Sequence, residues 1–384
     1  MSLLFQIFLI SIIASLAFNY SIISGYLYSS NIIAAFISLL VIANLKISQL
    51  INEKNNIILL GLLTFFILIN LQSFEGLKWI YLFIMYYSFS LYFKYFSYSV
   101  NYILWSYVLG LFLGTVLSFE FVDISLLGYN VTSNEFRGAI DALGGFNTFG
   151  VLAALAVIIL IHFQNIYKNN FLTLLLYVPI IFLLFAEIST LSRGGFFTLL
   201  LALFFYNIFN RSIERFFGYI LLMLIGLFLL SLSIDTRDLL DRYLFYNDAT
   251  GSGRTELWAY TLGLMNNPIN IIFGHGAGTL NIDANVLSNM SVAFYLESAH
   301  NTYLEIFYQF GLIGLSLFIV FLVNTASALN IIKRIEDQII LKTLFFTLLC
   351  NFFFDSYFFS LQVAAIFCLF YAMFNFGNSN EKFI

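Results

Sequence analysis

The feature that most constrains this chain is a series of apolar runs, each about as long as a membrane-spanning helix. A helix needs about 20 mainly apolar residues to cross roughly 30 Å of hydrocarbon. Such runs recur along all 384 residues, of which 61% are hydrophobic and only 9% are charged. Backbone polar groups in lipid must be satisfied within their own segment, so each run is expected to be helical. The sequence therefore predicts an all-α polytopic membrane protein.

The hydropathy pattern predicts about 12 spans in a single membrane domain, 1–384. The first run lacks a basic leading region and a small-residue cleavage site, so we interpret it as a spanning helix rather than a removed signal peptide. No soluble domain or internal repeat is evident. The expected spans are 3–20, 28–45, 56–72, 77–93, 100–118, 148–165, 171–188, 195–210, 216–234, 302–325, 339–355 and 357–376.

Basic residues are distributed unevenly between the two sides that these spans define. With the N-terminus inside, 10 of the 16 lysine and arginine residues fall on the cytoplasmic side, as the positive-inside rule predicts. Five of the six exceptions are arginine, whose guanidinium suits phosphate or carboxylate binding. Pairing with nearby acidic residues is the alternative, most clearly for the two arginines at 237 and 242. The six outer residues are Lys78, Arg137, Arg193, Arg237, Arg242 and Arg254.

Two outer segments, 119–147 and 235–300, are long enough to fold over the membrane as lids. In the second, Thr255 to Asn266 is amphipathic at helical spacing, and Asn266-Asn267-Pro268 is a typical helix stop. Its apolar residues could lie on the bundle or in the membrane interface. We therefore expect a large outer loop that carries short amphipathic helices. The apolar residues are Leu257, Tyr260, Leu262 and Leu264.

Arg193 lies in the sequence LSRGGFF, in a short outer turn between two apolar runs. Its charge opposes the topology signal, and an ionisable residue at this depth is costly unless it is paired or functional. Gly194 and Gly195 would let a ligand or another backbone approach closely. The alternative is a buried ion pair with Glu187.

Arg254 follows Gly251-Ser252-Gly253 and opens the expected outer helix. Unpaired N–H groups at a helix start favour an anion, so a phosphate there would meet a guanidinium and a helix terminus together. A solvated arginine that pairs with Glu256 or Asp248 is the alternative.

His300 stands where the second outer segment re-enters the membrane, with Ser298 as an expected N-cap. A histidine can take a proton near neutral pH, which suits it to activate a hydroxyl group. A purely structural histidine is the alternative. Asn301 and Glu305 have i, i+4 spacing and are expected to bond to each other, although Glu305 falls inside the apolar run.

The glycine cluster and the spacing of the histidines give no indication of nucleotide or metal binding. FGHGAG, residues 273–278, follows no βαβ unit and lacks the lysine and hydroxyl of a P-loop, so it does not indicate nucleotide binding. The three histidines, His162, His275 and His300, lack metal-ligand spacing. We expect neither a metal nor another cofactor.

These residues together resemble the O-antigen ligase and polymerase superfamily of membrane glycosyltransferases. The resemblance covers about 137–315 and depends most on AHNTYLEIFYQFGLIGL, residues 299–315. The other three segments are RGAIDALGGFNTFG (137–150), LSRGG (191–195) and GSGRTELW continuing to NPINIIFGHGAG (251–278).

The resemblance implies a metal-independent, inverting transfer of a glycan from an undecaprenyl diphosphate carrier to an acceptor hydroxyl. Arg193 and Arg254 would hold the diphosphate, and His300 would accept the hydroxyl proton. Arg137 and Asn147 would lie near the sugars, with Asn301 and Glu305 also binding substrate. The implied location is the periplasmic face of the bacterial cytoplasmic membrane, in lipopolysaccharide or surface polysaccharide biosynthesis. The membrane lipids surround the protein, and no nucleic acid is involved.

Several functions remain open on the sequence alone. A ligase would use lipid A core as acceptor, a polymerase would use another carrier-linked glycan, and a relative would use a protein hydroxyl. A lipid-linked glycan flippase belongs to a different class, but such transporters typically show repeats and charges near the midplane. A scaffold protein would not need Arg193, Arg254 and His300 together.

Overall fold

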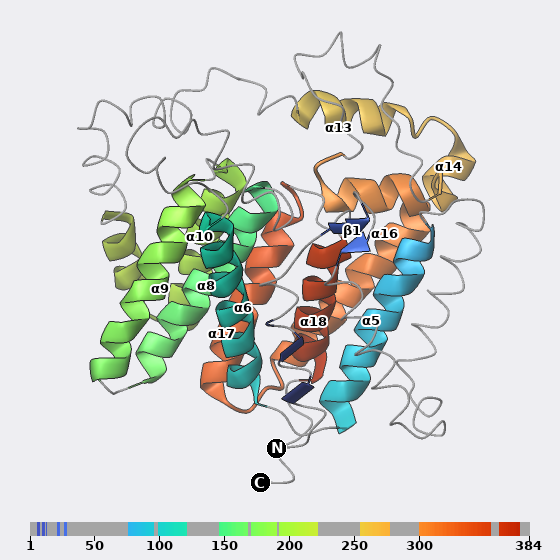
Figure 1. Ribbon diagram of the computed structural model, residues 1–384. Helices are drawn as coiled ribbons and strands as arrows, with labels where there is room; N and C mark the ends of the chain where they lie inside the picture. Colours follow the sequence, from blue (N-terminus) through green and yellow to red (C-terminus); the bar gives the residue numbers. More distant parts are fainter. Residues whose placement is uncertain are drawn as a thin grey trace, which may run out of the picture.

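In the computed structural model, the described residues lie mainly in helices (Figure 1). The predictions for spans 28–45 and 56–72 and for Arg137 lie outside the described residues. The described residues are 6, 7, 10, 11, 13, 21–23, 27–28, 76–95, 99–120, 146–167, 170–189, 192–221, 254–276, 299–354 and 361–376.

Eight long helices dominate this part of the chain, and each coincides with a predicted span to within several residues. A small antiparallel hairpin, β1 (Ser21–Ile23) with β2 (Leu27–Tyr28), is the exception to the expected all-α fold. Residues 213–221 are also helical, at the predicted span 216–234. The eight helices are α5 (Gly76–Tyr95), α6 (Val100–Glu120), α8 (Phe146–Ile166), α9 (Asn170–Ser189), α10 (Arg193–Phe209), α16 (Thr302–Leu329), α17 (Ile335–Asn351) and α18 (Leu361–Phe376).

Two of these helices are long and apolar enough to cross a membrane by length and composition, Asn147–Ile166 and Thr302–Leu329. Three shorter apolar helices lie at Val100–Val116, Phe171–Glu187 and Arg193–Phe209. The described residues therefore confirm a helical protein with candidate membrane helices, whereas the total of about 12 spans stays a prediction.

The helices pack side by side as a bundle, in which α8 lies among α6, α9, α10 and α17 (Figure 1). Helix α8 contacts α6, α9, α10 and α17, and its residues 151–160 are all buried. Short connections join α8 to α9, α9 to α10 and α16 to α17, so these neighbours are antiparallel. Consequently the first residues of α8, α10 and α16 and the last residues of α9 and α17 reach the same end of the bundle.

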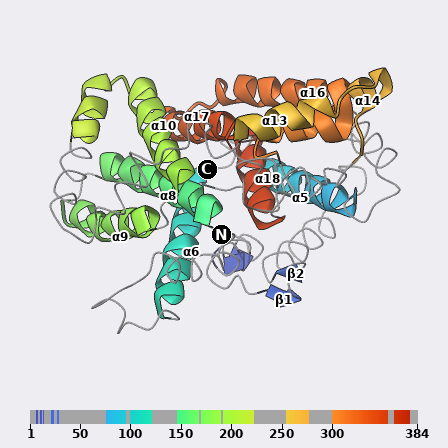
Figure 2. The same cartoon turned by 90° about the horizontal axis from the view of Figure 1, so that it is seen from above.

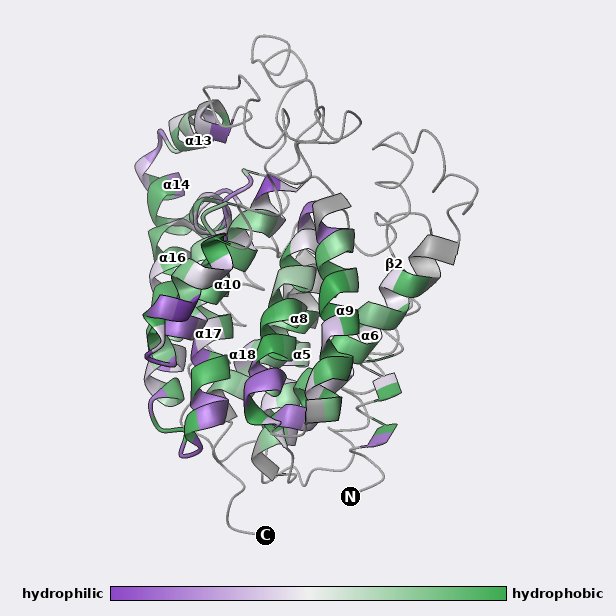
Figure 3. Ribbon diagram, turned by 90° about the vertical axis from the view of Figure 1, so that its left-hand side faces the viewer, coloured by the Kyte–Doolittle hydropathy of each residue, from purple (hydrophilic) through white to green (hydrophobic). Residues whose placement is uncertain are grey.

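The outside of the bundle carries apolar stripes at helical spacing. On α9, Phe171, Leu174, Val178 and Ile181 are each more than 60% exposed. Figure 3 shows hydrophobic residues along most of α6 and α9. A helix that is apolar both inside and outside the bundle is typical of a membrane protein.

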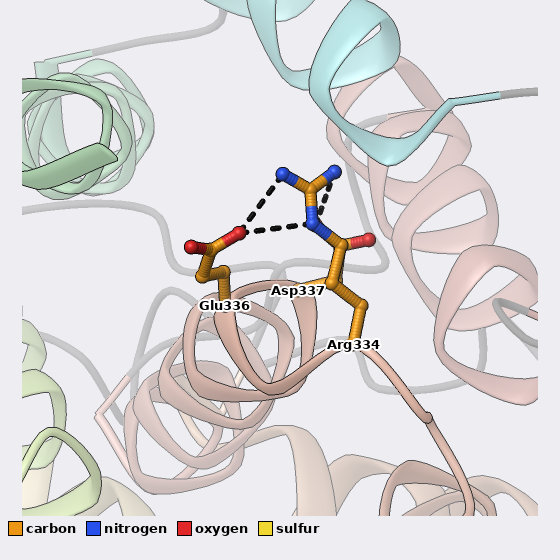
Figure 4. Close-up of polar contacts among 3 residues, drawn as sticks. All are labelled: Arg334, Glu336 and Asp337. Carbon is orange, nitrogen blue, oxygen red and sulfur yellow. Dashed lines mark hydrogen bonds and ion pairs between the residues drawn. The ribbon is translucent and has the colours of Figure 1, made fainter. Parts of the chain in front are cut away.

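The opposite end of the bundle carries basic residues. Arg211 and Arg215 follow α10, and Lys333 and Arg334 occupy the turn between α16 and α17. Arg334 forms an ion pair with Glu336 at 2.9 Å and a longer one with Asp337 at 3.9 Å (Figure 4). This distribution agrees with the end that the positive-inside rule assigns to the cytoplasm.

Two short helices cover the other end, α13 (Arg254–Gly263) and α14 (Pro268–Phe273). Figure 2 shows α13 alongside the start of α16 when the bundle is seen from above. The predicted amphipathic helix is therefore present, but it ends at Gly263 rather than Asn266. Asn267 and Pro268 begin the next helix, because Asn267 accepts a hydrogen bond from Ile269 N and proline suits a first helical position.

Helix α16 is not the single continuous span that the hydropathy pattern predicts. Gly311 has φ 64° and ψ −166°, which is not helical, so α16 is two helices joined across a kink. The hydropathy pattern could not show this break, because Gly311 lies within an apolar run and glycine only permits such a conformation.

Candidate functional site

Asn147 and Arg193 are brought together where α8 and α10 begin. The hydroxyl of Ser192 donates to Asn147 Oδ1 at 3.0 Å, and Ser192 Oγ accepts from Gly195 N at 3.1 Å. Ser192 is thus the N-cap of α10 and fixes the start of the helix against α8. Arg193, the next residue, is exposed. It is the first residue of α10, and a helix N-terminus favours an anion.

The end of α17 connects this pair to the start of α16. The Thr198 hydroxyl, one turn into α10, donates to Asn351 Oδ1 at 2.8 Å. The next carbonyl along α17, that of Phe352, accepts a hydrogen bond from Thr302 N at 2.8 Å. Because these contacts are continuous, α10 and α16 start at the same end of the bundle, on either side of α17.

His300 and Asn301 directly precede α16. Asn301 is the N-cap, and its Oδ1 accepts from Leu304 N at 3.0 Å, so the predicted capping by Ser298 is wrong. His300 has φ 46°, in the left-handed region that few side chains other than asparagine, aspartate and histidine adopt. It is half-buried. The histidine thus lies in the turn that precedes α16 and is not part of the helix.

Glu305 is buried in the first turn of α16, and the predicted bond to Asn301 stays a prediction, because the contact described for the Glu305 side chain is to another residue. Its Oε1 accepts from Ala299 N at 2.9 Å, while the Asn301 side chain caps the helix. A carboxylate that accepts a backbone N–H is stabilised in a setting where it would otherwise be costly.

Arg254 is joined to the same turn through α13. The indole N–H of Trp258 donates to the carbonyl of Ala299, adjacent to His300, at 2.9 Å. Arg254 lies one helical turn before Trp258 and is the first residue of α13, as predicted. Leu257 of α13 and Met265, which follows the helix, are buried in one cluster with Tyr308 of α16, whereas Leu262 is 52% exposed and does not belong to the packed face.

Residues 274–276 of the glycine cluster have a structural role that the sequence did not reveal. Close to the kink at Gly311, the carbonyls of Tyr308 and Gln309 accept hydrogen bonds from His275 N and Gly276 N, each at 2.9 Å. Gly274 lies so close to α16 that a Cβ there would be 2.3 Å from the Gln309 carbonyl oxygen.

His275 lies at the same junction. Its ring stacks on Tyr308 with centroids 4.4 Å apart, and its Nε2 lies 2.9 Å from Asn270 Nδ2. The structure therefore gives this histidine partners on α14 and α16.

The bundle end above α8, α10 and α16 thus combines two arginines, a histidine in a tight turn, and buried polar side chains that fix their backbones. Cationic groups and a nearby base can stabilise a leaving anion and accept a proton. Sequence patterns indicated Arg193, Arg254, His300, Asn147, Asn301 and Glu305, but missed Ser192 and Trp258. Their contacts depend on chain segments far apart in sequence. Among the residues described, no group of three or more His, Cys, Asp or Glu side chains is placed to hold a metal ion.

The described residues thus form a helical bundle with candidate membrane helices and a polar end that carries the candidate site residues. Residues 178–319 match the family model described as O-antigen ligase, and this match supports membership of the O-antigen ligase and polymerase family. The match runs from α9 into α16 and includes Arg193, Arg254 and His300, but not Arg137 or Asn147. It supports a function of the O-antigen ligase type, or a related one in polysaccharide biosynthesis. No curated protein matches the chain.

Proposed function

We propose that this protein is an O-antigen ligase that transfers a glycan from an undecaprenyl diphosphate carrier to a hydroxyl of lipid A core. The observation that carries the proposal is the contact chain from Asn147 through Ser192 and α17 to the turn at His300. It supports a single site, because residues from four segments meet at one end of the bundle. The family match supports the class of reaction.

In the proposed reaction, the acceptor oxygen attacks the anomeric carbon, and the bond from that carbon to the diphosphate breaks. The bonding electron pair leaves with the diphosphate, and His300 takes the proton of the attacking hydroxyl. Arg193 and Arg254 stabilise the charge that develops on the leaving group. Attack from the opposite face inverts the anomeric configuration. Asn147, Arg137, Asn301 and Glu305 belong to the substrate-binding surroundings in this proposal.

The proposed site faces the periplasm, in the bacterial cytoplasmic membrane. Basic residues such as Arg215 and Arg334 lie at the opposite end, which supports this orientation. A transporter is less consistent with the described residues, because the candidate site residues Arg193, Arg254 and His300 lie at the starts of helices rather than near the middle.

Glycan transfer by the purified protein in detergent, with chelator present, tests the proposal. The donor is undecaprenyl diphosphate-linked glycan, and lipid A core and a second donor molecule compete as acceptors. Product on lipid A core defines a ligase, whereas lengthened carrier-linked glycan would establish the polymerase alternative. Loss of transfer with chelator, or retained anomeric configuration, would contradict the proposed chemistry.

Two variants test the roles of the residues. His300→Asn keeps a side chain that tolerates positive φ but removes the imidazole, and it should abolish transfer. Arg254→Ala should reduce transfer by about 100-fold or more, the typical loss of a transition-state donor. The matched control is Arg215→Ala, at the opposite end, which should retain wild-type transfer. Full activity of His300→Asn would exclude His300 as the base.

A further inference from the structure

The peptide groups of Ala299 are held from both sides by the side chains of Glu305 and Trp258. Its N–H donates to Glu305 Oε1, and its carbonyl accepts from Trp258 Nε1, both at 2.9 Å. Ala299 is fully buried, and Glu305 is only 3% exposed. Because Ala299 directly precedes His300, both contacts act on the backbone that carries the imidazole.

His300 needs such support, because its φ of 46° is uncommon for a residue other than glycine. An uncommon backbone conformation persists only when surrounding contacts determine it, and such conformations concentrate at functional sites. Asn301 secures the other side of the turn by capping α16. The turn is therefore fixed on its helix side by the cap and on its loop side by Glu305 and Trp258.

We infer that Glu305 and Trp258 are positioning residues that hold the His300 turn in its reactive geometry through the two hydrogen bonds to Ala299. The inference rests on the proposed function, in which His300 accepts the acceptor proton. In this inference the Glu305 side chain holds the backbone of Ala299, instead of making the substrate contact expected from the sequence. It also gives α13 a second role, because the helix that carries Arg254 orients His300 through Trp258.

Positioning residues leave a characteristic kinetic pattern. A small displacement of a catalytic group reduces turnover strongly. It does not change the binding of the donor when the groups that hold the donor stay in place. Loss of either bond should therefore lower kcat and leave the KM for the carrier-linked donor unaltered.

Trp258→Phe provides the first test, because it removes the indole N–H and keeps an aromatic ring. The expected kcat is at least tenfold below wild type, with the donor KM within twofold. Trp105→Phe is the matched control, because Trp105 Nε1 likewise donates one hydrogen bond, to the Tyr167 hydroxyl at 3.1 Å, at the other end of the bundle. This control should keep wild-type kcat. Equal kcat for the two variants would overturn the role of Trp258.

Glu305→Gln and Glu305→Leu provide the second test. Glutamine keeps an oxygen that can accept from Ala299 N, so it should restore most of the kcat that leucine loses. Thermal unfolding of the same preparations in detergent reports whether each variant is folded. If glutamine is as inactive as leucine while remaining folded, the negative charge is required and the positioning role is wrong.

The outcomes of these variants distinguish a failure of this inference from a failure of the proposed function. Activity in His300→Asn contradicts His300 as the base, whatever the other variants do. An inactive His300→Asn together with a fully active Trp258→Phe contradicts the positioning role of Trp258 and leaves the proposed base in place. If Glu305→Leu does not fold, the comparison of Trp258→Phe with Trp105→Phe still tests the positioning inference.

Discussion

Gly150 and Gly195 touch through their backbones where α8 crosses α10. A Cβ atom on Gly195 would lie 2.7 Å from the Cα of Gly150, and one on Gly150 would lie 2.9 Å from the Cα of Gly195. Three residues before Gly150 is Asn147, and two residues before Gly195 is Arg193. The distance between these two candidate site residues is therefore set by a contact that only glycine permits.

Gly195→Ala should separate the starts of α8 and α10. The added methyl group meets backbone atoms that cannot rotate away, so we expect a loss of about 1–3 kcal/mol in the free energy of unfolding. Glycan transfer should fall by about tenfold or more, because Arg193 moves relative to Asn147. Thermal unfolding in detergent and the transfer assay measure both effects.

The neighbouring Gly194→Ala is the matched control for this prediction. A Cβ there would meet only Ser192 Oγ, at 3.7 Å, which is an ordinary contact. Wild-type unfolding temperature is expected for Gly194→Ala. An equal loss of stability in both variants would contradict the importance of the Gly150–Gly195 contact.

Gly311→Ala should disrupt the junction between the kink in α16 and the loop after α14. The position has φ 64°, and a Cβ would lie 2.2 Å from the carbonyl oxygen of Ile272. Alanine in the left-handed region costs about 1–2 kcal/mol, and the steric overlap of its Cβ adds to this cost. We therefore expect the free energy of unfolding to fall by about 2–5 kcal/mol, as measured by thermal unfolding. Gly263→Ala is the control, since nothing lies within 4 Å of its added Cβ. If Gly311→Ala were as stable as Gly263→Ala, this junction would not fix the kink.

Thr198→Val should weaken the contact between α10 and α17. The substitution preserves shape but removes the hydroxyl that donates to Asn351 Oδ1, and Asn351 is fully buried. A buried acceptor without its donor costs about 1–3 kcal/mol, measurable by thermal unfolding in detergent.

The control for Thr198 is Thr343→Val in α17. The Thr343 hydroxyl bonds only within its own helix, to the Ile339 carbonyl at 2.8 Å, in the contacts described. Its loss should cost less, because it connects no second helix. The reverse order of stabilities would show that the α10–α17 hydrogen bond contributes little.

Arg334→Gln should have little effect on stability, although Arg334 has two acidic partners. The guanidinium and the Glu336 carboxylate are 45% and 51% exposed, so solvent screens their attraction. We expect less than about 1 kcal/mol change in unfolding free energy and unchanged glycan transfer. A larger loss of stability, or one that does not diminish with added salt, would mean that the pair acts as a buried contact.

The helices themselves were predictable, because apolar runs such as 148–165 leave a lipid-embedded backbone few alternatives. The start of α13 at Arg254 was predictable as well, from glycine and serine before an amphipathic pattern. The end of α13 was not, since Asn267 and Pro268 read equally as a helix stop or as the N-cap and first residue of α14. Local sequence cannot distinguish a helix end from a helix start here, because the same two residues are typical of both.

The site shows the same division. The candidate residues could be identified without a structure, because Arg193, Arg254 and His300 are costly or unusual in an apolar chain. Their placement depends on packing between helices, through the hydrogen bonds from Trp258 to Ala299 and from Ser192 to Asn147 and the two glycine contacts. A hydropathy pattern describes one segment at a time. These contacts join residues up to 45 positions apart and depend on how whole helices pack.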